Sequence, residues 1–282
     1  LERAMAGDRR LRRAAGALYD APARALARDL GARGPVLTVS TACASGATAL
    51  GLAAEWLRDD RADLVVAGGY DILCRFVMRG FDALRSLTRE RVRPFDRRRS
   101  GLLLGEAGAL VLMARDGDTR GPVLGRLLGH ASTSDGSHIA APDPEGRGLA
   151  EAIRVALAEA DVATADVDFV SAHGTATPLN DRIEAAVLGR ALGARAGSVP
   201  VNSIKGALGH TMGAAATLEA IMCLLAARHS VVPPTLGLEA PDPACQLDHV
   251  VGAPRAVGTR VSLSTSLGFG GCNAALVLEG GA

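Results

Sequence analysis

The chain has few of the features that mark nucleic-acid-binding, membrane or secreted proteins. Basic and acidic residues nearly balance, and a formal net charge of +1 over 282 residues does not indicate a nucleic acid as partner. No apolar run is long enough to cross a bilayer, and no secretory signal pattern is recognisable at the start. These absences favour a cytoplasmic protein without membrane contact. A hydrophobic content of 48% is enough to bury a large core.

Cysteine is also scarce. The five cysteines lack the spacing of a metal site, and their odd number argues against a framework of disulfides. We therefore expect reduced thiols, no metal and no cofactor. The cysteines interpreted as core or loop residues are Cys74, Cys223, Cys245 and Cys272.

The remaining cysteine, Cys43, is the candidate nucleophile because it lies where a strand passes into a helix. Residues 35–39 are a short apolar, β-branched segment typical of a buried strand, and residues 44–57 carry apolar residues at helical spacing. The free N–H groups of a first helical turn favour an anion such as a thiolate. A small buried cysteine that only fills space is the alternative, and Cys43 alone does not exclude it.

Two histidines lie at similar junctions. His173 follows an apolar strand-like segment in the loop SAHGTATPLND, residues 171–181. Lys205 and His210 lie in the glycine-rich loop NSIKGALGHTMGAAA, residues 202–216. Because α/β enzymes place their chemistry at strand-to-helix junctions, we interpret these loops and the cysteine as one candidate site. Either histidine alone is more often structural.

A fourth loop, STSLGFGGCN at residues 264–273, joins two strand-like segments. Its glycines let the backbone approach a ligand closely, and its backbone N–H groups are suited to stabilise an oxyanion. A glycine-rich hairpin without a catalytic role is the alternative interpretation.

The chain contains, in this order, TACASG, AHGTATP with Asp181 after it, IKGALGHTMGAA and GFGGCN. This set resembles the motifs of the β-ketoacyl-acyl-carrier-protein synthases, the condensing enzymes of the thiolase superfamily. The likeness is closest to elongating fatty-acid synthases and polyketide ketosynthases, and it extends to residues 93–113. The resemblance implies a decarboxylative Claisen condensation, in which an enzyme-bound acyl thioester and malonyl-acyl carrier protein give 3-oxoacyl-acyl carrier protein.

The resemblance also implies a role for each matching residue. Cys43 would carry the acyl chain as a thioester, and His173 and His210 would bind the malonyl thioester and stabilise the enolate. The backbone N–H groups of Cys43 and Phe269 would form the oxyanion hole. Phe269 and Gly270 would form the gate that responds to acylation.

Two further pairs receive supporting roles from the resemblance. Lys205 and Glu219 match a buried pair that orders the histidine loops, whereas Glu219 read alone is an ordinary helix-face carboxylate. Asp181 and Glu184 are three residues apart at a helix start, where they suit the helix dipole and receive at most a support role.

Three residues are candidates for contact with the carrier protein. Thr175 and Thr177 match threonines that hydrogen-bond its pantetheine arm, although turn chemistry alone also explains them. Arginines crowd residues 75–99, which resembles the region that meets the acidic carrier protein, and Arg85 is the candidate docking residue. A solvated charged face is the alternative. The resemblance further implies a homodimer, or a heterodimer with a ketosynthase-like subunit.

The expected fold class is α/β, because helix-like and strand-like segments alternate along the chain. The resemblance implies a thiolase-like layered αβαβα fold of two similar halves, residues 1–121 with the nucleophile and residues 122–282 with both histidines. Only a helical, arginine-rich stretch of 33 residues precedes Gly34, so we expect the N-terminal half to be incomplete and to expose apolar edges. Helices are predicted at residues 44–57, 79–87, 151–160, 180–192 and 213–227, and strands at residues 64–70, 108–114, 121–132, 167–171 and 199–203.

Two functions remain open at this stage. The first is an acyl-condensing enzyme, and the second is a non-catalytic partner subunit that resembles a chain-length factor. Partners of that kind share the fold but usually lack the cysteine, so Cys43 together with both histidines favours catalysis. The short N-terminal segment favours the partner.

Overall fold

The computed structural model describes residues 16, 18–119 and 121–281. The chain divides into two compact units, residues 1–40 and residues 41–282. Every residue predicted to belong to the site lies in the second unit. Among the described residues, no helix combines the length and the apolar character that crossing a membrane requires.

The first unit differs from the sequence-based expectation. Its helix α3 (Ala21–Asp29) has no buried residue. The buried strand predicted at residues 35–39 is wrong, because these residues form no strand and Val36 and Leu37 are 45% and 54% exposed. A strand becomes buried only when neighbours satisfy its backbone groups, and none of the described strands pairs with this segment. The helical structure expected for residues 1–15 lies outside the described residues.

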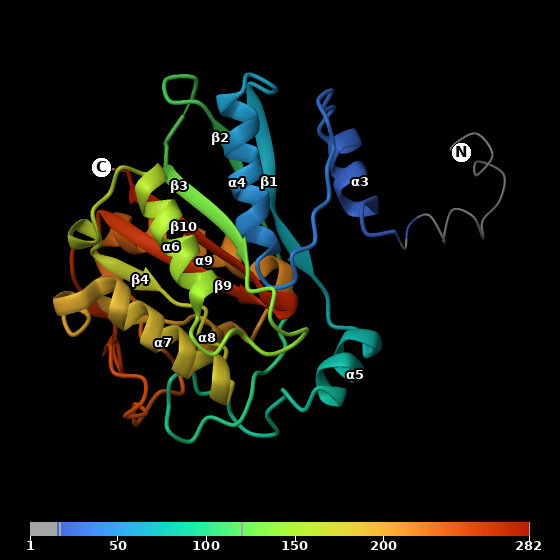
Figure 1. Ribbon diagram of the computed structural model, residues 1–282. Helices are drawn as coiled ribbons and strands as arrows, with labels where there is room; N and C mark the ends of the chain where they lie inside the picture. The colour runs from blue at the N-terminus through green and yellow to red at the C-terminus, as the bar shows by residue number, and fades with distance from the viewer. Residues whose placement is uncertain (1–15, 17, 120, 282) are drawn as a thin grey trace. The chain divides into compact units, whose positions relative to one another are not determined.

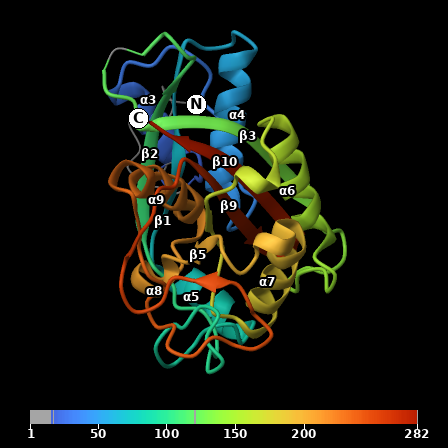
Figure 2. The same cartoon turned by 90° about the vertical axis from the view of Figure 1, so that its left-hand side faces the viewer.

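The second unit is built on a mixed six-stranded sheet and a smaller two-stranded sheet (Figures 1 and 2). In the large sheet, β3, β10 and β9 are antiparallel neighbours, and β9, β4, β5 and β7 are parallel neighbours. In order across this sheet the strands are β3 (Gly125–Ser134), β10 (Cys272–Gly280), β9 (Val261–Gly268), β4 (Phe169–Ser171), β5 (Pro200–Asn202) and β7 (Asp248–His249). The small sheet pairs β1 (Leu64–Asp71) with β2 (Ala107–Ala114), and a short ribbon pairs β6 (Val231–Val232) with β8 (Arg255–Ala256).

Helices cover both faces of the large sheet. On one face lie α6 (Arg147–Glu159) and α7 (Pro178–Leu192), which bury their apolar sides against the sheet. On the other face, α4 (Ser45–Arg58) and α9 (Ala215–His229) pack against both sheets (Figure 2). The connections contain the short helices α5 (Arg75–Ala83), α8 (Lys205–Leu208), η1 (Thr164–Asp166), η2 (Gly193–Arg195), η3 (Met212–Ala214) and η4 (Phe269–Gly271).

The layer between the sheets is rich in alanine. Ala47 and Ala53 of α4 and Ala216 and Ala220 of α9 are all buried in one apolar cluster. Small side chains let helices approach closely, which is how two helices fit side by side between two sheets. Leu50 of α4 supplies the larger apolar contact in the same cluster. Both helices therefore have fixed positions, and the segment that precedes each of them carries a site residue.

The second unit contains two similar segments. In one, α4 leads to the antiparallel pair β1 and β2, and in the other, α9 leads to the antiparallel pair β9 and β10. This arrangement agrees with the layered α/β fold of similar halves expected from the sequence. The half that contains β1 and β2 has only two strands in its described sheet, against six in the other. The division into halves at residues 121 and 122 stays a prediction.

In the second unit most predicted elements are confirmed to within a few residues, and α5 is the main exception there. Its helix was expected at residues 79–87 but spans residues 75–83. Arg85 has a φ of +53°, a left-handed conformation that does not continue a right-handed helix. The helix expected from residue 213 starts as the 3-10 turn η3 and becomes α-helical at Ala215.

Candidate active site

Three reactive side chains from distant parts of the sequence meet in the second unit. One ligand-type atom from each of Cys43, His173 and His210 lies within 4.8 Å of the others, and all three residues are buried. The two imidazole rings are 5.2 Å apart between centroids and nearly perpendicular. The structure therefore brings together the cysteine and the two histidines that the sequence selected.

The loop before α4 holds Cys43 at a sharp turn. Ala42 has a φ of +51°, and α4 begins at Ser45. The Ser45 hydroxyl donates to the carbonyl oxygen of Ala42 at 2.6 Å and accepts the N–H of Thr41 at 2.9 Å. A left-handed alanine costs about 1 kcal/mol and persists only where its surroundings hold it. These two hydrogen bonds supply that constraint and fix the direction of the cysteine.

The sulfur of Cys43 is a thiol at neutral pH. Burial raises its pKa to about 11, whereas the Lys205 cation and the backbone N–H groups of Phe269 and Cys43 act in the opposite direction. From the sequence, the N-terminus of α4 was expected to favour a thiolate. In the structure, the cost of burying that charge is larger than this effect. The two backbone N–H groups expected to form an oxyanion hole thus both hydrogen-bond the sulfur.

His173 follows β4 and is held through its backbone. Its N–H donates to one oxygen of Glu184 at 2.7 Å, and the N–H of Gly174 donates to the other oxygen at 2.8 Å. The hydroxyl of Thr265 also donates to Glu184, at 2.7 Å. Burial raises the pKa of Glu184 to about 7 despite these hydrogen bonds. Glu184, which received at most a support role from the sequence, thus holds the loop that carries His173.

Asp181, one turn earlier in α7, also holds nearby backbone segments through hydrogen bonds. It accepts the N–H of Ala176 at 3.1 Å and the N–H of Phe95 at 2.7 Å, and it is fully buried. Ala176 and Phe95 both have positive φ values, of +69° and +61°. Burial raises the pKa of Asp181, while its hydrogen-bond donors and Arg99 lower it. One carboxylate therefore holds two strained backbone positions beside the cavity.

His210 lies between α8 and η3, with its tautomer set by the backbone. The N–H of Met212 donates to Nδ1 of His210 at 3.3 Å, so the neutral ring carries its proton on Nε2. That Nε2 is buried and has no hydrogen-bond partner among the described residues. Burial, with Lys205 as the next cause, holds the pKa of both His210 and His173 well below the usual range. Both rings are neutral at pH 7.

Lys205 and Glu219 form a buried ion pair between α8 and α9. Burial raises the pKa of Glu219 to about 7, and Lys205 lowers it. The same cation lowers the pKa of Cys43, His173 and His210. The pair predicted from the sequence therefore exists, and its positive end acts on every reactive group of the site.

The three side chains open onto a cavity of about 380 Å³. Thr175 and Thr177, which share a hydrogen bond of 3.0 Å between their hydroxyls, line this cavity. Arg85 lies exposed at its rim and forms no ion pair with the described residues. By contrast, Arg98 and Arg99 of the same arginine-rich segment are engaged in ion pairs with Glu239, Asp96, Asp181 and Asp242.

Phe269 closes one side of the cavity from the turn between β9 and β10. Its ring lies 5.4 Å from that of Phe81 on α5. Gly270 has a φ of +81°, and its N–H donates to the carbonyl oxygen of Ile139 at 2.8 Å. The N–H of Gly270 is thus used to fix the turn, which leaves the N–H of Phe269 for the sulfur.

Two residues of the site were not found from the sequence. His138 lines the cavity, and its Nδ1 accepts the N–H groups of Ala140 and Ala141 at 3.0 and 2.9 Å. It lies in a connection without helix or strand periodicity, so nothing local singled it out. Asp71, at the end of β1, accepts the N–H of Gly213 at 3.1 Å and raises the pKa of Cys43 by its charge. The sequence feature that could have identified Asp71 is a carboxylate directly after a predicted strand.

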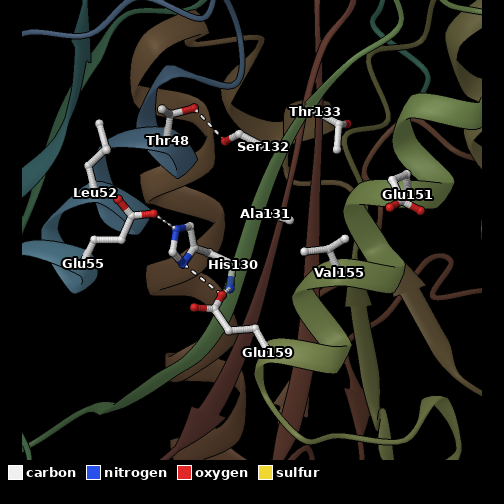
Figure 3. A pocket seen from close by; sticks show the side chains of 10 residues that line it. All are labelled: Thr48, Leu52, Glu55, His130, Ala131, Ser132, Thr133, Glu151, Val155 and Glu159. Carbon is white, nitrogen blue, oxygen red and sulfur yellow. Dashed lines mark hydrogen bonds and ion pairs between the residues drawn. The ribbon is translucent and has the colours of Figure 1, made fainter. Parts of the chain in front are cut away.

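A second hollow of about 490 Å³ lies between α4, β3 and α6 (Figure 3). Its histidine, His130, has Nε2 3.1 Å from Glu55 and Nδ1 3.1 Å from Glu159. The hydroxyls of Thr48 and Ser132 are 3.3 Å apart across its upper part. His130 thus lies between carboxylates of α4 and α6, and its Nδ1, although near Glu159, has no hydrogen-bond partner among the described residues.

Comparison with known proteins identifies the family. The β-ketoacyl synthase N-terminal domain matches residues 2–118, and the β-ketoacyl synthase C-terminal domain matches residues 124–239. The chain belongs to the β-ketoacyl synthase family. The family resemblance stated from the motifs is thereby confirmed.

Named relatives agree with this assignment. The chain is 40% identical to the tetracenomycin polyketide synthase ketoacyl synthase alpha subunit of Streptomyces glaucescens, over 90% of this chain and 62% of the relative. It is 37% identical to the 3-oxoacyl-[acyl-carrier-protein] synthase 2 of a Synechocystis strain, over 89% of this chain and 63% of the relative. The chain thus spans less than two thirds of the length of these curated relatives.

Solved structures give the same fold. The ishigamide ketosynthase/chain length factor superposes with a TM-score of 0.88 at 35% identity, covering 94% of this chain and 66% of that chain. A type II polyketide ketosynthase solved with its acyl-carrier protein superposes with a TM-score of 0.90 at 29% identity, covering 93% and 67%. The thiolase-like β-ketoacyl synthase fold is therefore established for this chain.

Proposed function

We propose that the protein catalyses the decarboxylative condensation of an acyl group on Cys43 with malonyl-acyl carrier protein, in fatty acid or polyketide synthesis. The observation that supports this most directly is the meeting of one thiol and two neutral imidazoles, with two backbone N–H groups directed at the sulfur. The curated relatives named above are a ketoacyl synthase alpha subunit and a 3-oxoacyl synthase. The alternative of a non-catalytic partner subunit receives no support from this site.

In the first step, the sulfur of Cys43 attacks the thioester carbonyl of an acyl carrier. A new carbon–sulfur bond forms, the bond to the carrier thiol breaks, and the thiol proton passes to the departing carrier. The N–H groups of Cys43 and Phe269 stabilise the oxyanion that forms on the way. A neutral imidazole is the base within reach of the sulfur, because the pKa of both rings is held low.

In the second step, the malonyl thioester loses carbon dioxide and leaves an enolate. The Nε2–H of His210 is a buried donor whose direction is fixed by the backbone of Met212, and His173 offers a second ring beside it. A neutral donor suits this oxygen because it stabilises negative charge without being deprotonated by it. The enolate carbon then attacks the acyl carbonyl on Cys43, and the sulfur leaves and takes up a proton.

The carrier protein is the proposed macromolecular partner. Arg85 at the rim of the cavity is suited to an acidic surface, and Thr175 and Thr177 provide hydroxyls for a pantetheine arm inside it. One of the similar structures is described as a ketosynthase with its acyl-carrier protein, and another as a ketosynthase with a chain length factor. For this chain, a dimer with itself or with a ketosynthase-like subunit is proposed on that basis.

Separating the two steps tests the proposal. We expect Cys43→Ala to abolish acyl transfer and condensation, with mass spectrometry placing the acyl group of the parent protein on Cys43. We expect His210→Ala to remove malonyl decarboxylation and to leave acylation of Cys43 within about threefold. Acyl label on another cysteine, or equal loss of both steps in His210→Ala, would contradict the assignment.

Arg85→Glu should raise the KM for carrier-bound substrate and leave acylation by a short free thioester unchanged.

A further inference from the structure

The atoms that meet at the site also form a set of metal donors. The sulfur of Cys43 and one nitrogen each of His173 and His210 lie within 4.8 Å of one another. Donors on a tetrahedral zinc ion, with bonds of about 2.0 to 2.3 Å, are roughly 3.3 to 3.8 Å apart. Binding one ion would bring these atoms closer by about 1 Å. The spacing is therefore compatible with one bound ion.

Each of the two histidine rings has a buried nitrogen without a partner in the part of the chain that the structure describes. Nε2 of His210 and Nδ1 of His173 are both buried without a hydrogen-bond partner among the described residues, and each histidine is only 1% exposed. Each neutral ring keeps one lone pair, and in His210 that lone pair is on Nδ1, so a metal bound at Nε2 requires the other tautomer. A buried imidazole without a partner is uncommon in proteins, because the missing hydrogen bond costs about 1 to 3 kcal/mol. A ligand with matching geometry removes that cost.

We propose that this cluster binds a borderline-soft divalent cation of the zinc type through one thiolate and two imidazoles, which places the nucleophile in a reversible inactive form. Thiolate and imidazole are the donors that zinc prefers, and three protein donors leave a fourth position for water from the cavity. Harder cations such as magnesium prefer oxygen donors and are not expected to bind.

The binding step is balanced without redox change. The S–H bond of Cys43 breaks, its proton leaves to solvent, and a sulfur–metal bond forms. In His210 the proton moves from Nε2 to Nδ1, which releases the N–H of Met212 and frees Nε2 for the metal. Lys205 opposes the incoming charge, but its charge is balanced by Glu219, and Asp71 adds a negative charge near the sulfur.

Protection from alkylation tests the proposal without any substrate. We expect saturating zinc chloride to slow labelling of Cys43 by iodoacetamide at least tenfold, with reversal by a chelator. Labelling of Cys74 and Cys272, which are only partly buried, should not change. Cobalt(II) in place of zinc should give a thiolate charge-transfer band and the visible bands of four-coordinate cobalt, at one ion per chain. Unchanged labelling of Cys43 in saturating zinc would overturn the proposal.

Variants assign the ligands. Cys43→Ala, His173→Ala and His210→Ala should each lose the cobalt spectrum or weaken binding at least tenfold, while circular dichroism checks that they remain folded. Cys272→Ser and His229→Asn remove the same residue types elsewhere and should bind as the parent does. A cobalt spectrum retained in Cys43→Ala would overturn the proposal. Metal binding does not depend on the proposed condensation, so a chain that binds cobalt and fails to condense would refute only the latter.

Discussion

The sulfur of Cys43 is surrounded by groups that act on its pKa in opposite directions. Burial and the charge of Asp71 raise the pKa, whereas Lys205 and two backbone N–H groups lower it. The net result is a pKa of about 11, so the resting group is a thiol that must be deprotonated in the proposed acyl transfer. This explains why two neutral imidazoles lie beside it, because a protonated nucleophile needs a base.

The reactivity of this thiol should therefore depend steeply on pH. A thiolate fraction controlled by a pKa of about 11 rises tenfold per pH unit below that value, so alkylation of Cys43 should accelerate from pH 7 through pH 10 without a plateau. Quantitative mass spectrometry of iodoacetamide adducts measures this profile, with Cys74 as an internal comparison. A plateau below pH 8 would show that the N–H groups and Lys205 outweigh burial.

Lys205 should stabilise the fold through Glu219. Lys205→Met leaves the carboxylate buried without its cation, and breaking such a pair costs about 3 to 5 kcal/mol. Without Lys205 the pKa of Glu219 rises above its present value of about 7. The folded variant therefore keeps a proton on Glu219 up to a higher pH than the parent does, and it loses stability as the pH rises through that range. The loss of unfolding free energy should thus be larger at pH 8 than at pH 6, as measured by urea denaturation.

The matched control for Lys205→Met is Arg154→Met. Arg154 forms an ion pair with Glu151 on the surface of α6, with side chains 66% and 51% exposed. Exposed ion pairs contribute little to stability, so this variant should unfold nearly as the parent does at both pH values. Adding Glu219→Leu to Lys205→Met should recover part of the loss, and a double variant less stable than the single one would contradict the argument.

At the scale of elements, the site depends on close contact between β1 and the segment that follows His210. A Cβ added at Gly69 would lie 1.9 Å from the backbone oxygen of Gly213, so the two segments cannot keep their positions in Gly69→Ala. We expect a loss of about 1 to 3 kcal/mol in unfolding free energy, and slower decarboxylation because His210 moves with its loop.

Gly189→Ala is the control for this prediction. Gly189 lies within α7, and a Cβ there meets no atom within 4 Å. Alanine is favoured over glycine inside a helix by roughly 0.5 to 1 kcal/mol, so this variant should be slightly stabilised. Thermal and urea unfolding compare the two, and equal stability of both variants would show that the contact at Gly69 relaxes without cost.

The same elements explain how much was predictable from the sequence. The helices after Cys43 and His173 were found from apolar periodicity, and the junctions were found because strand-like runs end there. Glu184 and Asp181 show the limit, because their partners are backbone N–H groups that only the folded loop presents. The strand predicted at residues 35–39 was wrong for a related reason. The composition of this segment suits a strand, but strand formation depends on pairing with neighbours that sequence patterns do not identify.

At the scale of the whole molecule, the two sheets differ in what covers them. The six-stranded sheet has helices on both faces, whereas one face of β1 and β2 keeps large apolar side chains exposed. Val66 and Leu112 are directly opposed in the register and are 40% and 65% exposed, and Leu110 beside them is 52% exposed. An apolar strip of this kind favours contact between chains, since association removes it from water.

We therefore expect concentration-dependent self-association that Leu112→Lys weakens. A charge at the centre of the strip must be desolvated when two such faces meet, whereas in the monomer it stays in water and costs little. Sedimentation velocity over a range of concentrations should show a shift toward monomer in Leu112→Lys, with unfolding free energy within about 0.5 kcal/mol of the parent. Leu236→Lys, at a leucine 49% exposed outside this strip, should associate as the parent does. Equal association of all three proteins would show that a different surface joins the chains and that solvent covers the outer face of β1 and β2.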